Sequence, residues 1–446
     1  MKCKTIYVRF AIGFACLFVF APSFLFGQTS TERNYIFTKW QQSKWTPDAK
    51  TLETWRSQQK STLYRKMAAL PDSIKTKLTA RAQQALSYTW PALRASNYLE
   101  FKNTGNRSNF EAVQKERRTA LCNLVMGYLV SGDKKYLPSI VDGLWATLEE
   151  STWVLPAHVG AQKAGTNLPD PTEEIVDLVN GETAASVAAI QLLMKDELGQ
   201  TSPIINQRIH YELNKRIVVP YLQRTDFWWM GFGQRIPNNW NPWINANVLT
   251  VMLYTAQNAD TVNLVLNKLC KSVDKFVNGY GDDGACDEGP SYWSEAGGKL
   301  IQFLQLLKSV SAGRLDVSDK ELLHNIGTYI YKTHISGSYV VNFADATPRA
   351  IPEPNAVYAF GDYFNDDTLK RFAAYLSSLQ PNNFSLSNVN NFLHGVDVFQ
   401  ELYTTQKQEA LPAVSWLPST QVLTVRSKAG SSKGLFVAVQ GGHNDE

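Results

Sequence analysis

Apolar residues recur every three or four positions through most of the chain. Between residues 261 and 280 they occupy one such series: Val262, Val265, Leu266, Leu269, Val273 and Phe276. Residues 111–130, 182–198, 245–258 and 300–310 follow the same period. This spacing predicts amphipathic helices. Many helices of similar length, without a clean short repeat, predict a mainly α chain whose paired helices form an α/α toroid or solenoid from about residue 33 to about 400.

Four stretches between the predicted helices are long and rich in Pro, Gly and Asn. They cover residues 151–175, 225–244, 280–293 and 343–366. Loops of this length are uncommon in compact domains unless they carry function. We therefore expect the chemistry of this protein to reside in these loops.

The pattern changes after about residue 412. Residues 422–426 and 435–440 alternate apolar and polar positions, and a Ser/Gly/Lys segment separates them. This alternation predicts a β-hairpin. Because a lone hairpin is only marginally stable, we expect residues 412–446 to begin an antiparallel β-sandwich domain. The alternative is a small hairpin packed on the helical domain, which we place at residues 28–411.

The first 27 residues have the pattern of a secretory signal peptide. Lys2, Lys4 and Arg9 precede an apolar run over residues 10–26, and a polar segment follows. A short apolar run broken by Pro22 predicts cleavage rather than a membrane anchor. No other segment has the eighteen or so apolar residues that a membrane helix needs. We therefore expect an exported protein, periplasmic or secreted, without a membrane span in its mature form.

Composition excludes several classes of protein. The chain has 446 residues, of which 44% are hydrophobic and 19% charged, which excludes a disordered chain. Outside the signal peptide, 41 basic residues face 40 acidic ones, so no electrostatic footprint for nucleic acid is expected. Cys122 and Cys270 fall on apolar helical faces, and Cys286 lies in a loop as a candidate thiol near the site. The sequence contains no Cys-x-x-Cys motif, so a structural zinc site of that type is not expected. We expect no cofactor within this chain.

The densest chemistry lies in the segment Pro-Asn-Asn-Trp-Asn-Pro-Trp over residues 237–243. Asn side chains donate and accept hydrogen bonds, and Trp offers a flat platform for the face of a sugar ring. Helix capping explains one Asn but not the cluster. The candidate residues of this loop are Asn239, Asn241, Trp240, Trp243 and, slightly upstream, Arg235.

Three further segments carry candidate residues. Residues 281–293 combine four carboxylates with Tyr292. Turn formation explains Asp282 and Asp283 better than it explains Glu288. The spacing of the acidic residues does not fit the calcium loop of an EF-hand. Residues 153–158 place His158 near Trp153, where binding a ligand and hydrogen bonding to the loop backbone are equal alternatives. His443 follows the last predicted strand.

These motifs resemble the heparinase II/III-type polysaccharide lyases. The resemblance covers the chain from about residue 90 to its end and implies an α/α toroid followed by a C-terminal antiparallel β-sandwich. It implies that Asn239, with Asn241 as second choice, neutralises a uronate carboxylate. It also implies that Tyr292 is the base or acid and that His443 assists. Several family members carry His where this chain has Trp240. The family's metal-binding His and Asp residues fall beyond Glu446, so a structural divalent metal is expected only in a missing part of the β-domain.

The resemblance therefore implies an enzyme that cleaves acidic polysaccharides of the heparin, heparan sulfate or alginate type by β-elimination. Two alternatives stay open. One is a glycoside hydrolase on an α/α toroid, which would use two carboxylates such as Asp287 or Glu288 with another. The other is a non-catalytic glycan-binding protein that uses the Trp-rich loops.

Overall fold

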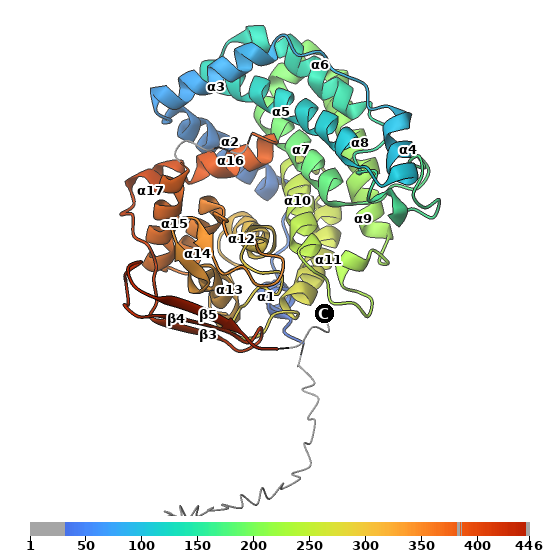
Figure 1. The fold of residues 1–446 in the computed structure, drawn as a ribbon. Helices are drawn as coiled ribbons and strands as arrows, with labels where there is room; N and C mark the ends of the chain where they lie inside the picture. Colours follow the sequence, from blue (N-terminus) through green and yellow to red (C-terminus); the bar gives the residue numbers. More distant parts are fainter. Residues whose placement is uncertain (1–31, 381–383, 385, 443–446) are drawn as a thin grey trace, which may run out of the picture. The chain divides into compact units, whose positions relative to one another are not determined.

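The described chain is mainly helical and ends in a small antiparallel sheet (Figure 1). This computed structural model describes residues 32–380, 384 and 386–442. The predicted signal peptide and His443 lie outside the described residues. The described residues from Arg33 onward belong to one compact unit. The predicted fold class, mainly α with paired helices of a toroid followed by antiparallel strands, is confirmed.

The helices of the described residues have the following bounds. They are α1 (Tyr35–Ser43), α2 (Ala49–Ala68), α3 (Asp72–Ala85), α4 (Ala95–Thr104), α5 (Ser108–Ser131), α6 (Leu137–Leu148), α7 (Leu178–Thr201), α8 (Pro203–Leu213), α9 (Val219–Gln223), α10 (Trp240–Thr255), α11 (Ala259–Val277), α12 (Trp293–Val310), α13 (Glu321–Lys332), α14 (Pro354–Tyr363), α15 (Asp367–Leu379), α16 (Val389–Asp397) and α17 (Phe399–Thr404).

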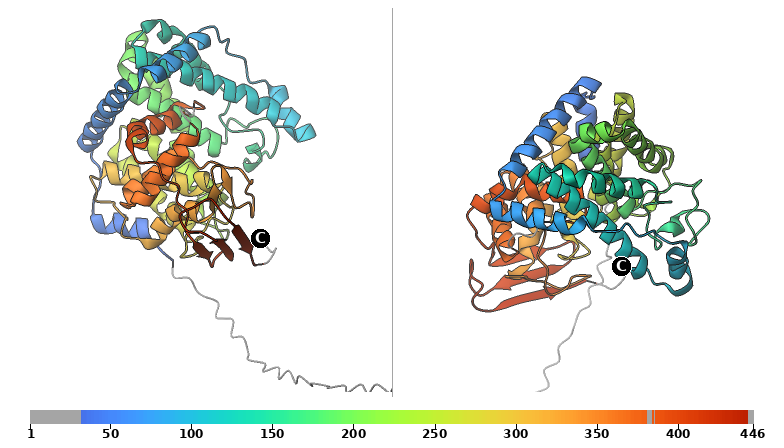
Figure 2. Two further views of the ribbon diagram at one scale, coloured as in Figure 1. Left: turned by 60° about the vertical axis from the view of Figure 1, so that its left-hand side comes forward. Right: turned by 90° about the horizontal axis from the view of Figure 1, so that it is seen from above.

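A central row of helices organises the fold. Helix α10 packs between α7 and α12, and α12 packs in turn against α14. A second layer covers this row, because α8 contacts α7, α11 contacts α10 and α15 contacts α14. This alternation of inner and outer helices is the pairing that the sequence predicts for an α/α toroid. Outside this row, α3 pairs with α5, and α16 contacts both α7 and α2 (Figures 1 and 2).

Sequence explains where the row's helices begin and which face they bury. Helix α11 starts after Asn258, whose side chain accepts hydrogen bonds from the backbone N–H groups of Asp260 and Thr261. Its stripe from Val262 to Val273 is buried against α10 and α1. Helix α7 is Ala-rich and buried over most of its circumference, because other helices pack against it on several sides.

The C-terminal sheet has the order β3–β4–β5, with β3 at Val414–Leu417, β4 at Val422–Arg426 and β5 at Phe436–Gln440. The predicted hairpin is β4 and β5, and β3 is an additional strand. One face of the sheet packs on the end of α13, where Thr424 donates to the carbonyl of Lys332. The division into domains at residue 412 stays a prediction, although the change from helix to strand falls there.

Two features differ from the expected elements. The predicted loop at 343–366 contains α14, which starts with Pro354 at its first position and is too short for a clear period. A two-stranded hairpin, β1 (His334–Ser336) and β2 (Tyr339–Val340), follows α13. Among the described helices, none combines the length and the apolar character that a membrane crossing requires.

Candidate functional site

The N-terminal ends of the central row of helices lie together. Trp243, in the first turn of α10, donates its indole N–H to Glu182 in the second turn of α7, at 3.1 Å. Lys299, in the second turn of α12, places its ammonium 5.5 Å from the centre of the Trp243 ring. Ser294 of α12 accepts the backbone N–H of Glu353 at 3.0 Å. These contacts put the N-termini of α7, α10, α12 and α14 at one end of the row.

The residues that precede these helices are the centre of the candidate site. Asp177, Asn239, Tyr292 and Glu353 are the N-cap residues of α7, α10, α12 and α14. Helices α7, α10, α12 and α14 contact one another in turn along the row, so their caps lie at the same end of it. Two candidates from loops some fifty positions apart, Asn239 and Tyr292, therefore lie at the same end of two contacting helices.

Asn239 and Tyr292 differ in exposure, and both have free polar groups. Asn239 is 6% exposed, and its amide makes no hydrogen bond with the described residues. Tyr292 is 42% exposed, and its hydroxyl also has no partner among the described residues. A buried amide is normally paired within the protein. Asn239 thus offers an unpaired donor and acceptor beside an accessible phenol.

Asn241 does not share this position, and its predicted catalytic role is wrong. Its side chain has no exposed surface and donates to the carbonyl of Trp229 at 2.8 Å and to Ser272. Its amide oxygen accepts from Asn245, one turn later in α10, at 3.1 Å. Its NH₂ group therefore joins α10 to α11 and to the preceding loop, and its oxygen is paired within α10.

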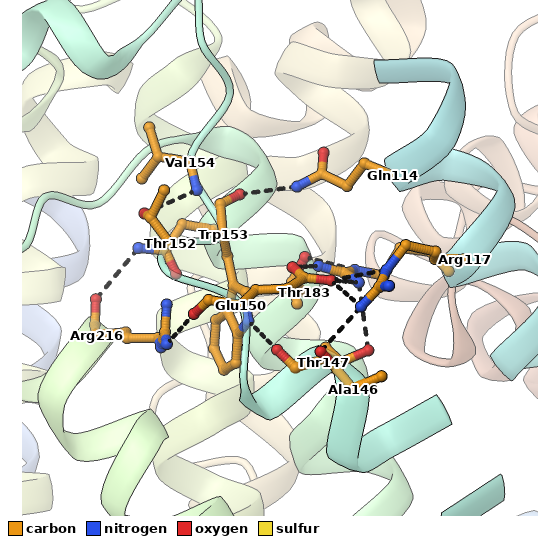
Figure 3. A network of polar contacts seen from close by, with 12 residues as sticks. Gln114, Arg117, Ala146, Thr147, Glu150, Thr152, Trp153, Val154, Thr183 and Arg216 are labelled. Carbon is orange, nitrogen blue, oxygen red and sulfur yellow. Dashed lines mark hydrogen bonds and ion pairs between the residues drawn. The ribbon is translucent and has the colours of Figure 1, made fainter. Parts of the chain in front are cut away.

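Trp153, a candidate substrate-binding residue, occupies a structural position that does not favour this role. It is fully buried, and its indole N–H donates to the carbonyl of Thr147 at 2.8 Å. The guanidinium of Arg216 lies over its ring, 4.7 Å from the centre. Figure 3 shows Trp153 within a network of buried Arg, Glu and Thr side chains.

That network fixes the loop that carries His158. Glu150 accepts hydrogen bonds from Arg117 and from both terminal nitrogens of Arg118, and its carbonyl accepts from Arg216 at 2.6 Å (Figure 3). Gln114 donates to the backbone of Trp153 at 3.3 Å. Because these partners come from α5, α6 and the segment after α8, the start of the loop is held from several sides.

His158, Trp240 and Trp228 form an aromatic row at the start of α10, where Trp240 follows Asn239. The rings of His158 and Trp240 have centres 4.6 Å apart, and those of Trp240 and Trp228 are 5.1 Å apart. The exposed Arg235 places its guanidinium 4.6 Å from the Trp228 ring. Trp240 and Trp228 are half-buried, so each retains accessible ring surface. Sequence reasoning singled out Trp240, His158 and Arg235 but missed Trp228.

Asp177 was also missed, although it is the polar residue just before the Ala-rich helix. Its carboxylate lies 2.7 Å from Nδ1 of His158 and also accepts the backbone N–H groups of Leu155 and Asn180. It is 2% exposed. The signal in the sequence was the N-cap preference for Asp before a helix, which does not reveal the histidine partner.

The acidic loop that ends at Tyr292 is fixed to the C-terminal sheet. Asp283 accepts the backbone N–H of Ser419 at 2.8 Å and also its hydroxyl, in the turn between β3 and β4. Gly284 has φ +73°, and a Cβ there would lie 2.3 Å from the backbone of Asn325, so only glycine fits. Asp283 is therefore structural, in line with the turn-forming interpretation of the sequence.

Glu288 lies on an acidic cleft of about 510 Å³ beside this loop, together with Asp287, Asp345 and the residues that follow β3. Burial raises the pKa of Glu288 to about 7, and the negative charges of Asp287 and Asp345 add to the effect. Near neutral pH this carboxyl group is therefore partly protonated. No contact joins it to Tyr292 directly.

A second set of charged groups lies below the cap residues. Burial raises the pKa of Glu295 to about 7, with Glu353 and Glu182 adding to the effect and Lys299 opposing it. Burial also opposes the charge of Lys299, but the same three carboxylates raise its pKa. Lys299 is 5% exposed. These residues gave no signal in the sequence, because charged residues in a helix are usually on a solvated face.

The three cysteines of the described chain are free and buried. Cys122 and Cys270 are buried core residues, as predicted. Cys286 is buried too, and burial raises its pKa, so it does not act as a thiol of the site. Within the part of the chain that the structure describes, no group of three or more His, Cys, Asp or Glu side chains is arranged to hold a metal ion.

Comparisons with known proteins give structural likenesses but no match in sequence. No family model matches the chain, and no curated protein matches it. Among solved structures, the chain is similar to a xanthan lyase from Paenibacillus, with 13% sequence identity and a TM-score of 0.48. The match covers 85% of this chain and 36% of that chain, so this chain spans about a third of the length of that lyase.

Proposed function

We propose that this protein is an exported polysaccharide lyase of the heparinase II/III type, which cleaves uronate-containing glycans by β-elimination. The observation that carries the proposal is the pairing of Asn239 and Tyr292. An unpaired, nearly buried amide and an accessible phenol belong to the N-caps of two contacting helices. The resemblance of the two loops to this family supports the same residues. The export signal at residues 1–27 is part of the proposal.

The chemistry explains why an amide is needed. A lyase removes the proton at C5 of a uronate, and the adjacent carboxylate resists the negative charge that develops. An amide N–H aimed at this carboxylate stabilises the enolate-like transition state, as oxyanion-hole donors do. The N-terminal ends of α7, α10, α12 and α14 add partial positive charge in the same place. In this proposal Asn239 donates to the carboxylate, and Tyr292 exchanges a proton with the sugar.

Binding would use the aromatic row and its neighbours. Trp240 and Trp228 offer ring faces for sugar rings, and Arg235 at the end of the row supplies a cation for an acidic group. Trp243 contacts Glu182 and Lys299 in the first turns of the central helices, so in this proposal it supports the residues that bind the sugar. Of the family's uronans, heparin or heparan sulfate and alginate are the substrates that we propose. His443 keeps its proposed assisting role.

The direct test measures unsaturated products from heparan sulfate and alginate, because elimination leaves a conjugated double bond that absorbs near-ultraviolet light. In Tyr292→Phe, we expect turnover to fall about 10²–10⁴-fold, since the proton-transfer group is lost. Tyr211→Phe, which changes another exposed phenol, on α8, is the control and should retain activity. Wild-type protein that yields no unsaturated product from any uronan would overturn the proposal.

Asn239 can be tested against the nearly isosteric Asp. In Asn239→Asp, a carboxylate would face the carboxylate of the substrate, so we expect a larger loss of kcat/KM than in Asn239→Ala. Asn241→Ala should instead lower the free energy of unfolding, because it removes the hydrogen bonds that join α10 to Ser272 and Trp229. Equal activity of wild type and Asn239→Asp would contradict the assigned role.

A glycoside hydrolase is the second candidate, favoured by one observation. Glu288, with its pKa raised to about 7, is a carboxyl group suited to donate a proton, and Asp287 and Asp345 are charged neighbours. Hydrolysis leaves no conjugated double bond. Products that show new reducing ends without near-ultraviolet absorbance, and their loss in Glu288→Gln, would support this candidate instead.

A further inference from the structure

The ring of His158 is held in one orientation by a buried carboxylate. Its Nδ1 lies 2.7 Å from the Asp177 carboxylate, and within the described residues no other hydrogen bond reaches the ring. A carboxylate only accepts, so Nδ1 carries the hydrogen of the neutral imidazole. The lone pair is then on Nε2, which is free to accept a proton.

Asp177 itself cannot turn away from His158. It is 2% exposed, it caps α7 by accepting the N–H of Asn180 at 2.7 Å, and it accepts the N–H of Leu155 at 3.2 Å. The start of the His158 loop is anchored by the buried network around Glu150 (Figure 3). A side chain whose supports are fixed on both sides holds its geometry to the tolerance that proton transfer requires.

The pair also lies where the proposed substrate would be. His158 contacts the ring of Trp240, the residue after Asn239, and 13% of its side chain is exposed. The charged group that faces its ring is Asp177, the N-cap of α7, and Arg235 lies over Trp228 at the other end of the aromatic row.

Two other described histidines pair with carboxylates, but in different settings. His334 pairs with Glu409 and has 1% of its side chain exposed, so substrate does not reach it. His324 pairs with Asp366 at 2.9 Å and stacks on Phe364, away from the caps of the central row. The His158–Asp177 pair is the one that contacts Trp240, the residue that follows Asn239.

We propose that His158 is the proton acceptor of the elimination and that Asp177 is its positioning residue. The inference rests on the proposed lyase function. Nε2 of His158 takes the C5 proton, and the electrons of the broken C5–H bond form the C4–C5 double bond. The C4–O bond breaks with its electrons on oxygen, and the hydroxyl of Tyr292 gives that oxygen its proton. The imidazolium formed is stabilised by Asp177, and solvent returns both groups to their starting states.

This division explains an otherwise difficult step. A phenol must lose its proton before it can act as a base, whereas a neutral imidazole with a free Nε2 already has the lone pair. Tyr292 then needs only to donate, which a neutral phenol can do. Asn239 acts on the substrate carboxylate whether His158 or Tyr292 accepts the C5 proton. The lyase function therefore does not depend on which of the two groups takes the proton.

The variant that tests the pair is Asp177→Asn, measured on whichever of heparan sulfate and alginate the wild type cleaves. Asn still caps a helix well, but with its oxygen on Asn180 its NH₂ would face Nδ1. The imidazole would then hold its hydrogen on Nε2 and could not accept a proton. We expect kcat to fall roughly 100-fold or more with little change in KM, and the acid limb of the pH profile to be altered.

The structure supplies a matched control in Asp366→Asn. Asp366 also caps a helix, α15, and also binds a histidine, His324, but it lies outside the site. This variant should keep wild-type kcat and pH profile. His158→Gln is the second variant, because it leaves the cap intact should Asp177→Asn fail to fold. Wild-type kcat in both His158→Gln and folded Asp177→Asn would overturn the inference while unsaturated products still supported the lyase function. Absence of such products from the wild type would overturn the function itself.

Discussion

Two regions of the molecule contrast in their packing: the caps of the central row keep an unpaired polar side chain that is nearly buried, and the outer face of the C-terminal sheet keeps apolar side chains exposed. At the caps, the amide of Asn239 is nearly buried and unpaired. On the sheet, apolar side chains are paired across strands but lie in solvent. They form two rows, Val414–Val425–Val437 and Trp416–Leu423–Val439, of which Trp416 is 54% and Val437 54% exposed.

The difference teaches which kind of partner each region lacks. A buried polar group without a partner costs free energy, so a site that keeps one is suited to a polar ligand. A contiguous apolar face in solvent marks a surface suited to apolar cover. Most polar groups of the network around Glu150 are paired, but other buried side-chain atoms in the described residues, among them the hydroxyl of Tyr136 and the amide oxygen of Asn123, also lack a partner. The predictions below test this contrast, beginning with the network.

The largest effect is expected at Glu150. In Glu150→Ala, the guanidinium groups of Arg117 and Arg118 would lose their buried carboxylate, and the free energy of unfolding should fall by about 3–5 kcal/mol. Denaturant titration measures this. Glu53→Ala, which removes an exposed carboxylate 3.9 Å from Arg56, is the control and should change stability by less than about 1 kcal/mol. Similar losses in both would mean that the network is not the scaffold of the site.

The sequence predicted the scaffold better than the site. Regular apolar spacing gave the helices around 111–130, 182–198 and 261–280, because burial on one face leaves a period. It missed α14, whose short length leaves too few repeats, and β3, which has only four residues. Strand pairing is decided by distant partners, which a local pattern does not contain.

The second prediction concerns the packed face of the sheet. Leu417 has no exposed surface, so Leu417→Ala should lower the free energy of unfolding by about 2–5 kcal/mol through lost burial and a cavity. Thermal or denaturant unfolding measures the loss. If Leu417→Ala were as mild as a change on the outer face, the two faces would not differ in the way that their exposure indicates.

The third prediction concerns Glu409, where the chain leaves the helices for the sheet. Although burial opposes it, hydrogen bonds from His334, the N–H of Gly337 and Tyr375 lower the pKa of Glu409 to about 2. A lowered carboxyl pKa stabilises the fold at pH above about 4.5, and this contribution is lost as pH falls toward 2. We expect a loss of up to roughly 3 kcal/mol over that range. Glu409→Gln should be less stable at neutral pH and should lack this part of the pH dependence.

Site residues were predicted from composition, and composition does not say which way a side chain points. Asn239 and Asn241 look alike in the sequence, yet Asn241 is turned toward Ser272, which is 31 positions away, and Asn239 is not. Trp153 and Trp240 look equally suited to a sugar, but Arg216 and Thr147 enclose the former. Those partners come from other helices, so only the fold separates structural from accessible residues.

The smallest effect on stability is expected on the outer face of the sheet. Val437 and Val439 are 54% and 53% exposed on β5, so replacing both with Thr removes little buried apolar surface while retaining β-branched side chains. The free energy of unfolding should change by only about 0.5 kcal/mol per site. Binding of a hydrophobic dye, in contrast, should fall, because two apolar groups leave an exposed patch. A large loss of stability in this double variant would show that the outer face is already covered in the folded protein, and the contrast between the sheet and the caps would then disappear.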